Sequence, residues 1–187
     1  MVSSSKLKLV INFILFQAIW FAAVIGAAKS NLWWCYGLFA IFLTWQLLPA
    51  NRKAGDCLNV IVLLVLGLLI DSTWVYTGLI EYRSHISWYN SAPNWILILW
   101  VSFALSLNHS MSWIYAKPNL AYWFGFIGGP LSYFAGERLG AIKINTPWLT
   151  TLCLAFAWLA VIWVIVKLRK ENYTNIFQFF LGKKTHA

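Results

Sequence analysis

Charged residues are scarce in this chain, and acidic ones are the scarcest. Only 10% of its 187 residues are charged, and Asp and Glu together number 5 against 14 Lys and Arg. Soluble domains carry about 25% charged residues, so this composition excludes an ordinary water-soluble globule. The chain is 61% hydrophobic, and several of its apolar runs reach the roughly 20 residues needed to cross a bilayer core. The sequence therefore predicts an integral membrane protein.

Paired cysteines and the common catalytic motifs are also missing. The three cysteines, Cys35, Cys57 and Cys153, are isolated and have no CxxC spacing, which argues against a disulfide framework and against a zinc site. The sequence contains no GxSxG, HExxH, DxxxD or glycine-rich phosphate loop. An intramembrane aspartyl protease needs two aspartates, whereas Asp71 is the only one inside a predicted span. We therefore expect no metal, no cofactor and no established protease class.

The apolar residues fall into six segments joined by short connections, which predicts antiparallel neighbours. We expect an all-α fold: one compact bundle of six transmembrane helices over residues 1–166, then a basic cytoplasmic tail over 167–187. That tail either lies as an amphipathic segment on the anionic inner leaflet or is solvated. The segments are Leu7–Ala28, Leu32–Pro49, Cys57–Ile80, Asn94–Tyr115, Asn119–Ile142 and Thr146–Val166.

The formal net charge of +9 indicates orientation rather than a nucleic-acid partner, because no basic face is interleaved with exposed aromatics. Basic residues concentrate in cytoplasmic loops. Six spans place ten basic residues on one side and four on the other, so both termini are predicted to be cytoplasmic, as expected for a multi-pass protein of a bacterial inner membrane. The ten are Lys6, Lys8, Arg52, Lys53, Lys117, Lys167, Arg169, Lys170, Lys183 and Lys184, and the four are Lys29, Arg83, Arg138 and Lys143.

Small residues recur through the stretch 124–141, which reads FGFIGGPLSYFAGERLGA. Gly125, Gly129, Ser132, Gly136 and Gly140 are spaced to form one helical stripe without bulk, which lets another backbone approach closely. Pro130 should kink the helix at residues 128–130. We expect this segment to be the central helix of the bundle.

Asp71 is the most informative single residue, because a carboxylate at that depth costs on the order of 2.5–3.5 kcal/mol. It is either neutral, or it faces a cation or a water-filled cavity. Gly67, Trp74 and Gly78 share its helix face, so the acid should point inward. Arg138 is the candidate cation, because its depth differs from that of Asp71 by only about one to two helical turns, and Glu137 would compete for it. The alternatives are that Asp71 is a structural clamp and that Arg138 extends to the outer headgroups.

His109 is the candidate partner or proton relay for Asp71, since imidazole serves as base, relay or ligand. It lies in the polar run LSLNHSMSW, beside Asn108 and Ser110. By depth it falls in the inner half of the bundle, nearer to Asn12 than to Asp71. The alternative is a histidine that makes one hydrogen bond across a helix interface.

Four motifs resemble an uncharacterised bacterial inner-membrane family catalogued as domain of unknown function 2878. They are NFILFQAIWFAAVIGAA from Asn12, GLLIDSTWVYTGL from Gly67, ILWVSFALSLNHSMSWI from Ile98 and GGPLSYFAGERLGA from Gly128. The resemblance implies a compact multi-spanning protein and carries no catalytic role. It also implies that the protein is encoded beside proteins similar to cyclopropane-fatty-acid synthases and flavin amine oxidases. That association hints at membrane-lipid modification.

The sequence favours a protein that binds or modifies a lipid-like molecule in an intramembrane polar pocket, with membrane lipid as its partner. Whether it is an enzyme stays open. The alternatives are an accessory subunit that binds another membrane protein or a second copy of itself, and a small proton-linked transporter. The candidate catalytic residues are Asp71 and His109. The candidate substrate-binding residues are Arg138, Ser132, Tyr133, Asn108, Gln17, Asn12, Trp74 and Glu137.

Overall fold

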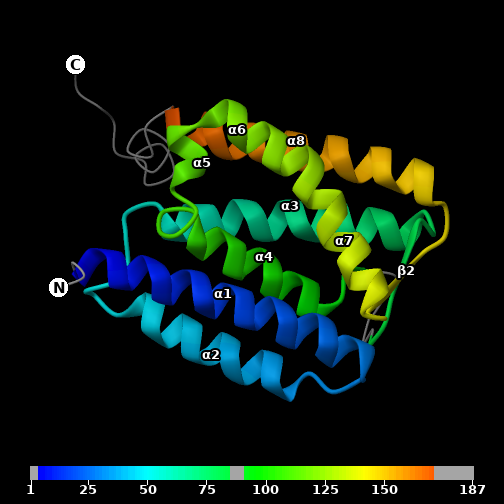
Figure 1. Cartoon of the computed structure of the whole chain (residues 1–187), viewed down its shortest axis with the longest axis horizontal. Coiled ribbons are helices and arrows are strands. Elements are labelled where there is room, and N and C mark those ends of the chain that lie inside the picture. Colours follow the sequence, from blue (N-terminus) through cyan, green and yellow to red (C-terminus); the bar gives the residue numbers. More distant parts are fainter. Residues whose placement is uncertain (1–3, 85–90, 171–187) are drawn as a thin grey trace, which may run out of the picture.

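The computed structural model describes residues 4–84 and 91–170, which form a bundle of antiparallel helices (Figure 1). The expected all-α class fits, with one small addition of strand. The helices are α1 (Ser4–Ala28), α2 (Trp33–Leu47), α3 (Asp56–Tyr76), α4 (Asn94–Ser106), α5 (Trp113–Ala116), α6 (Pro118–Trp123), the π-helix η1 (Phe124–Gly128), α7 (Gly129–Arg138) and α8 (Pro147–Lys170). The expected tail begins inside α8, and 171–187 lie outside the described residues.

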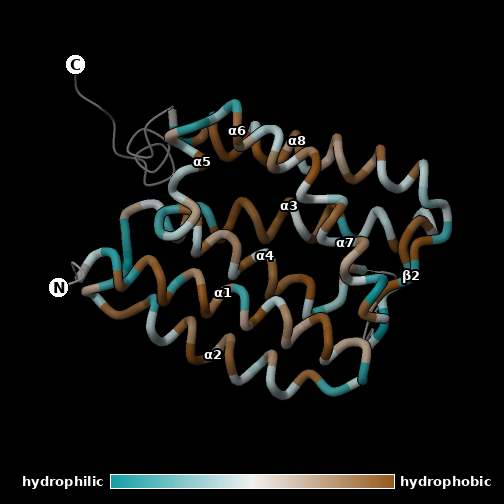
Figure 2. Tube along the Cα trace, in the orientation of Figure 1, coloured by the Kyte–Doolittle hydropathy of each residue, from teal (hydrophilic) through white to brown (hydrophobic). Residues whose placement is uncertain are grey.

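Three helices are long and apolar enough to cross a membrane: Ser5–Ala28, Asp56–Tyr76 and Pro147–Arg169. Large apolar side chains also cover the outside of the bundle, including Trp34, Phe156 and others on most helices. Apolar surface on this scale is not kept in water by a monomeric soluble protein. Figure 2 shows hydrophobic colouring along the helices and hydrophilic colouring mainly in the connections at the two ends. The chain is therefore built as a membrane protein.

The centre of the bundle is α4, and the expectation that the glycine-rich segment is central is wrong. Eight residues of α4 are buried, Trp95, Trp100 and Phe103 among them, and the helix packs on both α1 and α3. The run α6–η1–α7 instead exposes Trp123 and Leu131. Gly125, Gly129 and Gly136 lie on its buried inner face together with Tyr133, while Trp123, Ile127 and Leu131 face outward.

The close approach expected of the glycine stripe is present, and its partner is α8. A Cβ atom on Gly129 would lie 2.2 Å from Cγ of Trp158, and one on Gly125 would lie 2.5 Å from Cγ1 of Ile162. Where a kink was expected at Pro130, the five residues of η1 form a π-helical turn just before α7. Bulges of this kind relieve the strain of an interrupted hydrogen-bond ladder.

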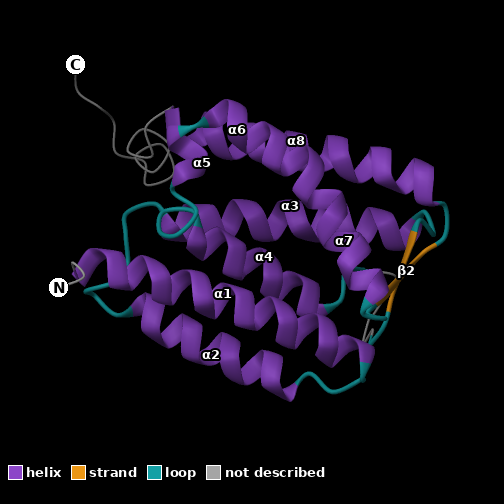
Figure 3. Ribbon diagram, in the orientation of Figure 1, coloured by secondary structure: helices purple, strands orange, loops and turns teal. Residues whose placement is uncertain are grey.

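A two-stranded antiparallel sheet was not foreseen at the sequence level. Strands β1 (Ile80–Tyr82) and β2 (Ile142–Ile144) pair at the end of the bundle opposite the N-terminus (Figure 3). The third and fifth predicted segments were therefore too long, because α3 ends at Tyr76 and α7 at Arg138. Positive φ at Gly78 and Gly140 (68° and 81°) turns the chain out of each helix.

Side chains alternate between the two faces along each strand, and this alternation decides which of them face the bundle. Tyr82 is buried, whereas Glu81 points outward to Lys143, with Nζ and Oε1 3.5 Å apart. Asn145 donates a hydrogen bond to Glu81 Oε1 at 2.7 Å. That hydrogen bond, together with the nearby Lys143 charge, holds the pKa of Glu81 below its ordinary value. The sheet thus carries its charges outside and delivers Tyr82 to the interior.

Candidate functional site

Two buried polar clusters lie on the inner face of α3, one near each end. Asp56 starts the helix and Asp71 lies fifteen residues further on, which separates them by about 22 Å along the axis. We call them the Asp71 cluster (Asp71, Tyr82, Trp100, Tyr133) and the Asp56–His109 cluster (Asp56, His109, Gln46, Asn108, Asn12). The single site expected from the sequence is therefore divided, and Asp71 and His109 belong to different halves.

In the Asp71 cluster, three side chains donate hydrogen bonds to one fully buried carboxylate. The hydroxyls of Tyr82 and Tyr133 donate to Oδ1 at 2.5 and 2.7 Å, and Trp100 Nε1 donates to Oδ2 at 2.7 Å. These donors come from β1, α7 and α4, so the acid connects α3 to three other elements. Such contacts replace the water that a buried carboxylate has lost.

The expected ion pair between Asp71 and Arg138 is not formed. Arg138 is exposed at the end of α7, while Asp71 has no accessible surface. Glu137 does not compete for the arginine either: its Oε1 accepts a hydrogen bond from the Ile144 backbone N–H at 2.8 Å and so fixes β2. The depth argument placed Arg138 close enough, but the phenols and indole that surround the acid already occupy its oxygens.

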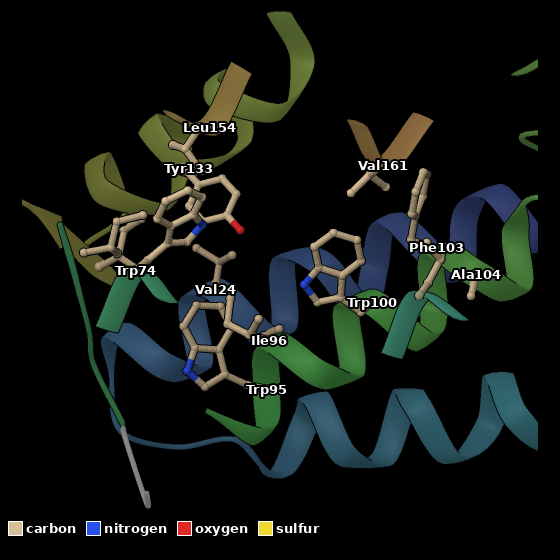
Figure 4. Close-up of a cluster of buried hydrophobic side chains, with 14 of the residues drawn as sticks. Val24, Trp74, Trp95, Ile96, Trp100, Phe103, Ala104, Tyr133, Leu154 and Val161 are labelled. Carbon is tan, nitrogen blue, oxygen red and sulfur yellow. The ribbon is translucent and has the colours of Figure 1, made fainter. Parts of the chain in front are cut away.

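A cavity of about 320 Å³ lies beside the Asp71 cluster, between α1, α4 and the run η1–α7. Half of its lining residues are aromatic, and Trp100 and Trp158 stack there with ring centroids 5.1 Å apart. Figure 4 shows Trp95 and Trp100 projecting from α4 toward the same interior as Tyr133. The volume is at the lower end of the range for small-molecule sites, and the mainly apolar lining is typical of them.

Three of the predicted binding residues line this cavity, namely Gln17, Ser132 and Tyr133. Asp71 does not line it, but all three of its donors do. Phe21 of α1 and Phe124 of η1 also line the cavity and are 50% and 41% exposed. Because both phenylalanines reach the outer surface of the bundle, the cavity communicates sideways with the space that lipid would occupy.

Trp74, another predicted binding residue, is buried behind the cavity wall. It is not among the lining residues, and its Nε1 makes no hydrogen bond within the part of the chain that the structure describes. Figure 4 shows its ring beside Tyr133. The prediction that Trp74 shares the Asp71 face of α3 is confirmed, and its position makes it a packing residue for Tyr133.

The Asp56–His109 cluster joins four segments at the opposite end of the bundle. His109 Nε2 lies 3.1 Å from Asp56 Oδ2 and 2.6 Å from Gln46 Nε2, with the proton position depending on the tautomer. Asn108 Nδ2 donates to Asp56 Oδ1 at 2.8 Å, and the Lys53 backbone N–H donates to Oδ2 at 2.8 Å. All four side chains are buried, so this is an acid–imidazole pair held by amides.

The hydrogen bonds of Asn12 confirm the prediction that His109 lies nearer in depth to Asn12 than to Asp71. Its Nδ2 donates to Gln46 Oε1 at 3.1 Å, and its Oδ1 accepts from Ser110 Oγ at 2.6 Å. The predicted fourth segment is interrupted here, since α4 ends at Ser106 and turns carry the chain to α5. The polar run around His109 therefore forms a buried turn fastened by Asn12 of α1, and neither Asn12 nor Asn108 reaches the cavity.

Four residues of the two clusters were missed by sequence reasoning. The predicted bounds place Asp56 in a connection, Gln46 inside the second apolar segment and Tyr82 in the connection after the third. Trp100 falls inside the fourth segment, and the sequence assigns it no role beyond packing. Asp56 carried a usable signal, because it is one of only 5 acidic residues and immediately precedes an apolar run, where acids favour a helix N-terminus. Tyr82 carried none, since its place depends on the pairing of β1 with β2.

Trp100→Phe tests the stabilising role of the Asp71 cluster. The variant keeps an aromatic ring but leaves Asp71 Oδ2 without its donor, so we expect a loss of about 1–3 kcal/mol in unfolding free energy. The measurement is the unfolding midpoint of the purified protein in detergent. Trp123→Phe is the control, because Trp123 is 64% exposed. Equal midpoints for both variants would show that the indole hydrogen bond contributes nothing.

The fold and its buried polar clusters define a helical membrane protein with an aromatic cavity open to its side. The chain belongs to the family described as "Protein of unknown function (DUF2878)", whose model matches residues 9–164. The family resemblance noted from the sequence is thereby confirmed. No curated protein and no solved structure matches the chain.

Proposed function

We propose that this protein crosses the bacterial inner membrane six times and binds a lipid-like molecule in the cavity between α1, α4 and α7. The six crossings would be the three long helices together with α2, the α4–α5 segment and the run α6–η1–α7. Figure 1 supports an even number, because the beginning of α1 and the end of α8 lie at the same end of the bundle. The excess of basic residues at that end supports cytoplasmic termini.

The observation that carries the proposal is an aromatic cavity with buried hydroxyls at one wall and a sideways opening. Apolar walls suit an acyl or isoprenoid chain, while Gln17, Ser132 and the phenols of Tyr82 and Tyr133 suit a polar headgroup. A water-soluble substrate would have to reach this site through lipid. An amphiphile already dissolved in the bilayer needs only to move past Phe21 and Phe124.

Filling the cavity tests the proposal. Gly128 lines it, and a Cβ there would be no closer than 3.7 Å to a neighbouring atom, so Gly128→Leu should occupy the cavity without forcing helices apart. We expect lipid that co-purifies with the wild-type protein in mild detergent to fall at least about fivefold, measured by native mass spectrometry and lipid extraction. Gly37→Leu is the matched control, since Gly37 of α2 has open space around it. Equal lipid content in both variants would refute binding in this cavity.

An accessory or structural role is the second candidate, and the Asp71 cluster favours it. A carboxylate whose two oxygens accept three hydrogen bonds, and which does not line the cavity, is well suited to hold helices together. The same Gly128→Leu measurement separates the two candidates, because a purely structural protein would retain its bound lipid unchanged.

A further inference from the structure

The hydroxyl hydrogens at the cavity wall are committed within the protein. The hydroxyl hydrogens of Tyr82 and Tyr133 go to Asp71, and that of Ser132 goes to the Gly129 carbonyl at 2.7 Å. Each of these three oxygens keeps lone pairs but has no hydrogen left to donate. The hydroxyls of the wall therefore offer only acceptors to whatever enters, and the donors that remain in the lining include Trp158 Nε1, which has no hydrogen-bond partner among the described residues, and the Gln17 amide.

The cavity lining also lacks a cation among the described residues. None of the lining residues identified in the described part of the chain is Lys, Arg or His, and Asp71 lies directly behind Tyr82, Trp100 and Tyr133. The Arg138 side chain, a candidate substrate-binding residue on the sequence, is exposed and does not line the cavity. An anionic headgroup would meet the acceptor oxygens of the hydroxyls, and none of the lining residues identified in the described chain would supply a compensating cation in this weakly screened environment.

We propose that this cavity selects amphiphiles whose headgroup donates hydrogen bonds, an alcohol or an amine, and rejects those with a carboxylate or phosphate. The inference rests on the proposed lipid-binding function and adds the chemistry of the ligand. The aromatic walls support the amine form further, because indole and phenol rings attract ammonium groups. Gln17 at the cavity wall can accept from either headgroup.

Three probes that differ only in headgroup test this selectivity: dodecylamine, dodecan-1-ol and dodecanoate. Binding is measured at pH 7.5 by native mass spectrometry of the full chain in nanodiscs of zwitterionic lipid, with the signal of Gly128→Leu subtracted as non-specific partition. We expect the amine and the alcohol each to bind at least about tenfold more tightly than the carboxylate. The ratio of amine to alcohol shows which of the two donor headgroups the site favours.

Asp71→Asn tests the origin of the selectivity. An amide can accept from Trp100 through its oxygen and donate to the phenols through its nitrogen, which frees the phenol hydrogens to point into the cavity. We expect the preference over dodecanoate to fall at least about fivefold. Tyr133→Phe gives a second test that spares the acid: affinity for the alcohol falls toward that for dodecanoate.

The outcomes separate this inference from the proposed function. If dodecanoate binds as tightly as the other two and Gly128→Leu removes all three, the cavity binds amphiphiles but the headgroup assignment is wrong. If Gly128→Leu changes none of them, the cavity is not the binding site and both proposals fail. If Asp71→Asn folds and leaves the preference intact, the acid does not set it, and the inference is overturned.

Discussion

Gly129→Ala is expected to destabilise the protein severely, whereas the same change one residue earlier is expected to be harmless. A Cβ on Gly129 would lie 2.2 Å from Trp158 Cγ and 2.3 Å from Cδ1. At Gly128 the nearest atom is a Phe124 ring carbon at 3.7 Å, an ordinary contact. The two positions are adjacent in the chain and differ only in which face of the helix they occupy.

The clash at Gly129 cannot be relieved by a small side-chain movement. The Trp158 ring is stacked on Trp100 at a centroid distance of 5.1 Å, and Trp100 donates to Asp71 and covers Gly67, where a Cβ would lie 2.3 Å from the indole. Pushing Trp158 away would therefore disturb α3, α4 and the Asp71 cluster together. We expect a loss of about 3 kcal/mol, at the upper end for overpacked interiors.

The measurement compares unfolding midpoints of Gly128→Ala, Gly129→Ala and the wild type in the same detergent. Alanine at Gly128 restricts the unfolded chain, so this variant should be as stable as the wild type or gain about 0.5 kcal/mol. Similar midpoints for the two alanine variants would mean that α7 and α8 do not approach as closely as the glycine contacts require.

Asp56→Ala is the second change with a large expected effect. It removes the acceptor for the Lys53 backbone N–H and for Asn108 Nδ2, and the carboxylate oxygen that lies 3.1 Å from His109 Nε2. A buried donor left without its partner costs about 1–3 kcal/mol, because it stays desolvated and unpaired, and Asp56→Ala leaves at least two such donors. The turn that carries His109 would also lose its connection to α3, so we expect the α4–α5 segment to loosen first.

Hydrogen exchange at the backbone amides of 107–112, together with the unfolding midpoint, checks this expectation. Glu81→Ala is the control, since Glu81 is exposed and its partner Lys143 is in solvent as well; exposed pairs contribute little. A double-mutant cycle of Asp56→Asn with His109→Gln then isolates the pair. Additive effects in the cycle, or unchanged exchange in Asp56→Ala, would show that the acid and the imidazole act independently.

Much of the helical layout follows from apolar run length. The starts of the segments at Asn94 and near Pro147 agree with α4 and α8, because hydrophobic length and a proline at the first turn are local signals. The ends of the third and fifth segments were wrong, since apolar residues such as Ile80 and Ile142 suit a helix or a strand equally well. Only the pairing of Ile80 with Ile144 and of Tyr82 with Ile142 makes them strand.

The candidate site was less predictable than the fold. Burial of Asp71 followed from its depth and its helix face, and the neighbourhood of Asn12 and His109 followed from matching depths in antiparallel helices. The partners of Asp71 did not follow: depth matching suggested Arg138, but Tyr133 is the residue of α7 that faces inward. Depth gives the position of a side chain along the bundle axis, whereas the rotation of the helix about its own axis decides which neighbour that side chain faces.

The sequence by itself determined that this protein is a helical membrane bundle with a few polar groups inside, because hydrocarbon tolerates only long apolar helices and makes each buried acid conspicuous. The tertiary structure decided that the acids Asp56 and Asp71 serve two separate clusters, that α4 rather than the glycine-rich helix lies at the centre, and that a cavity opens beside Tyr133. Those features depend on how helices rotate and pack against one another, which residue order along one helix does not specify.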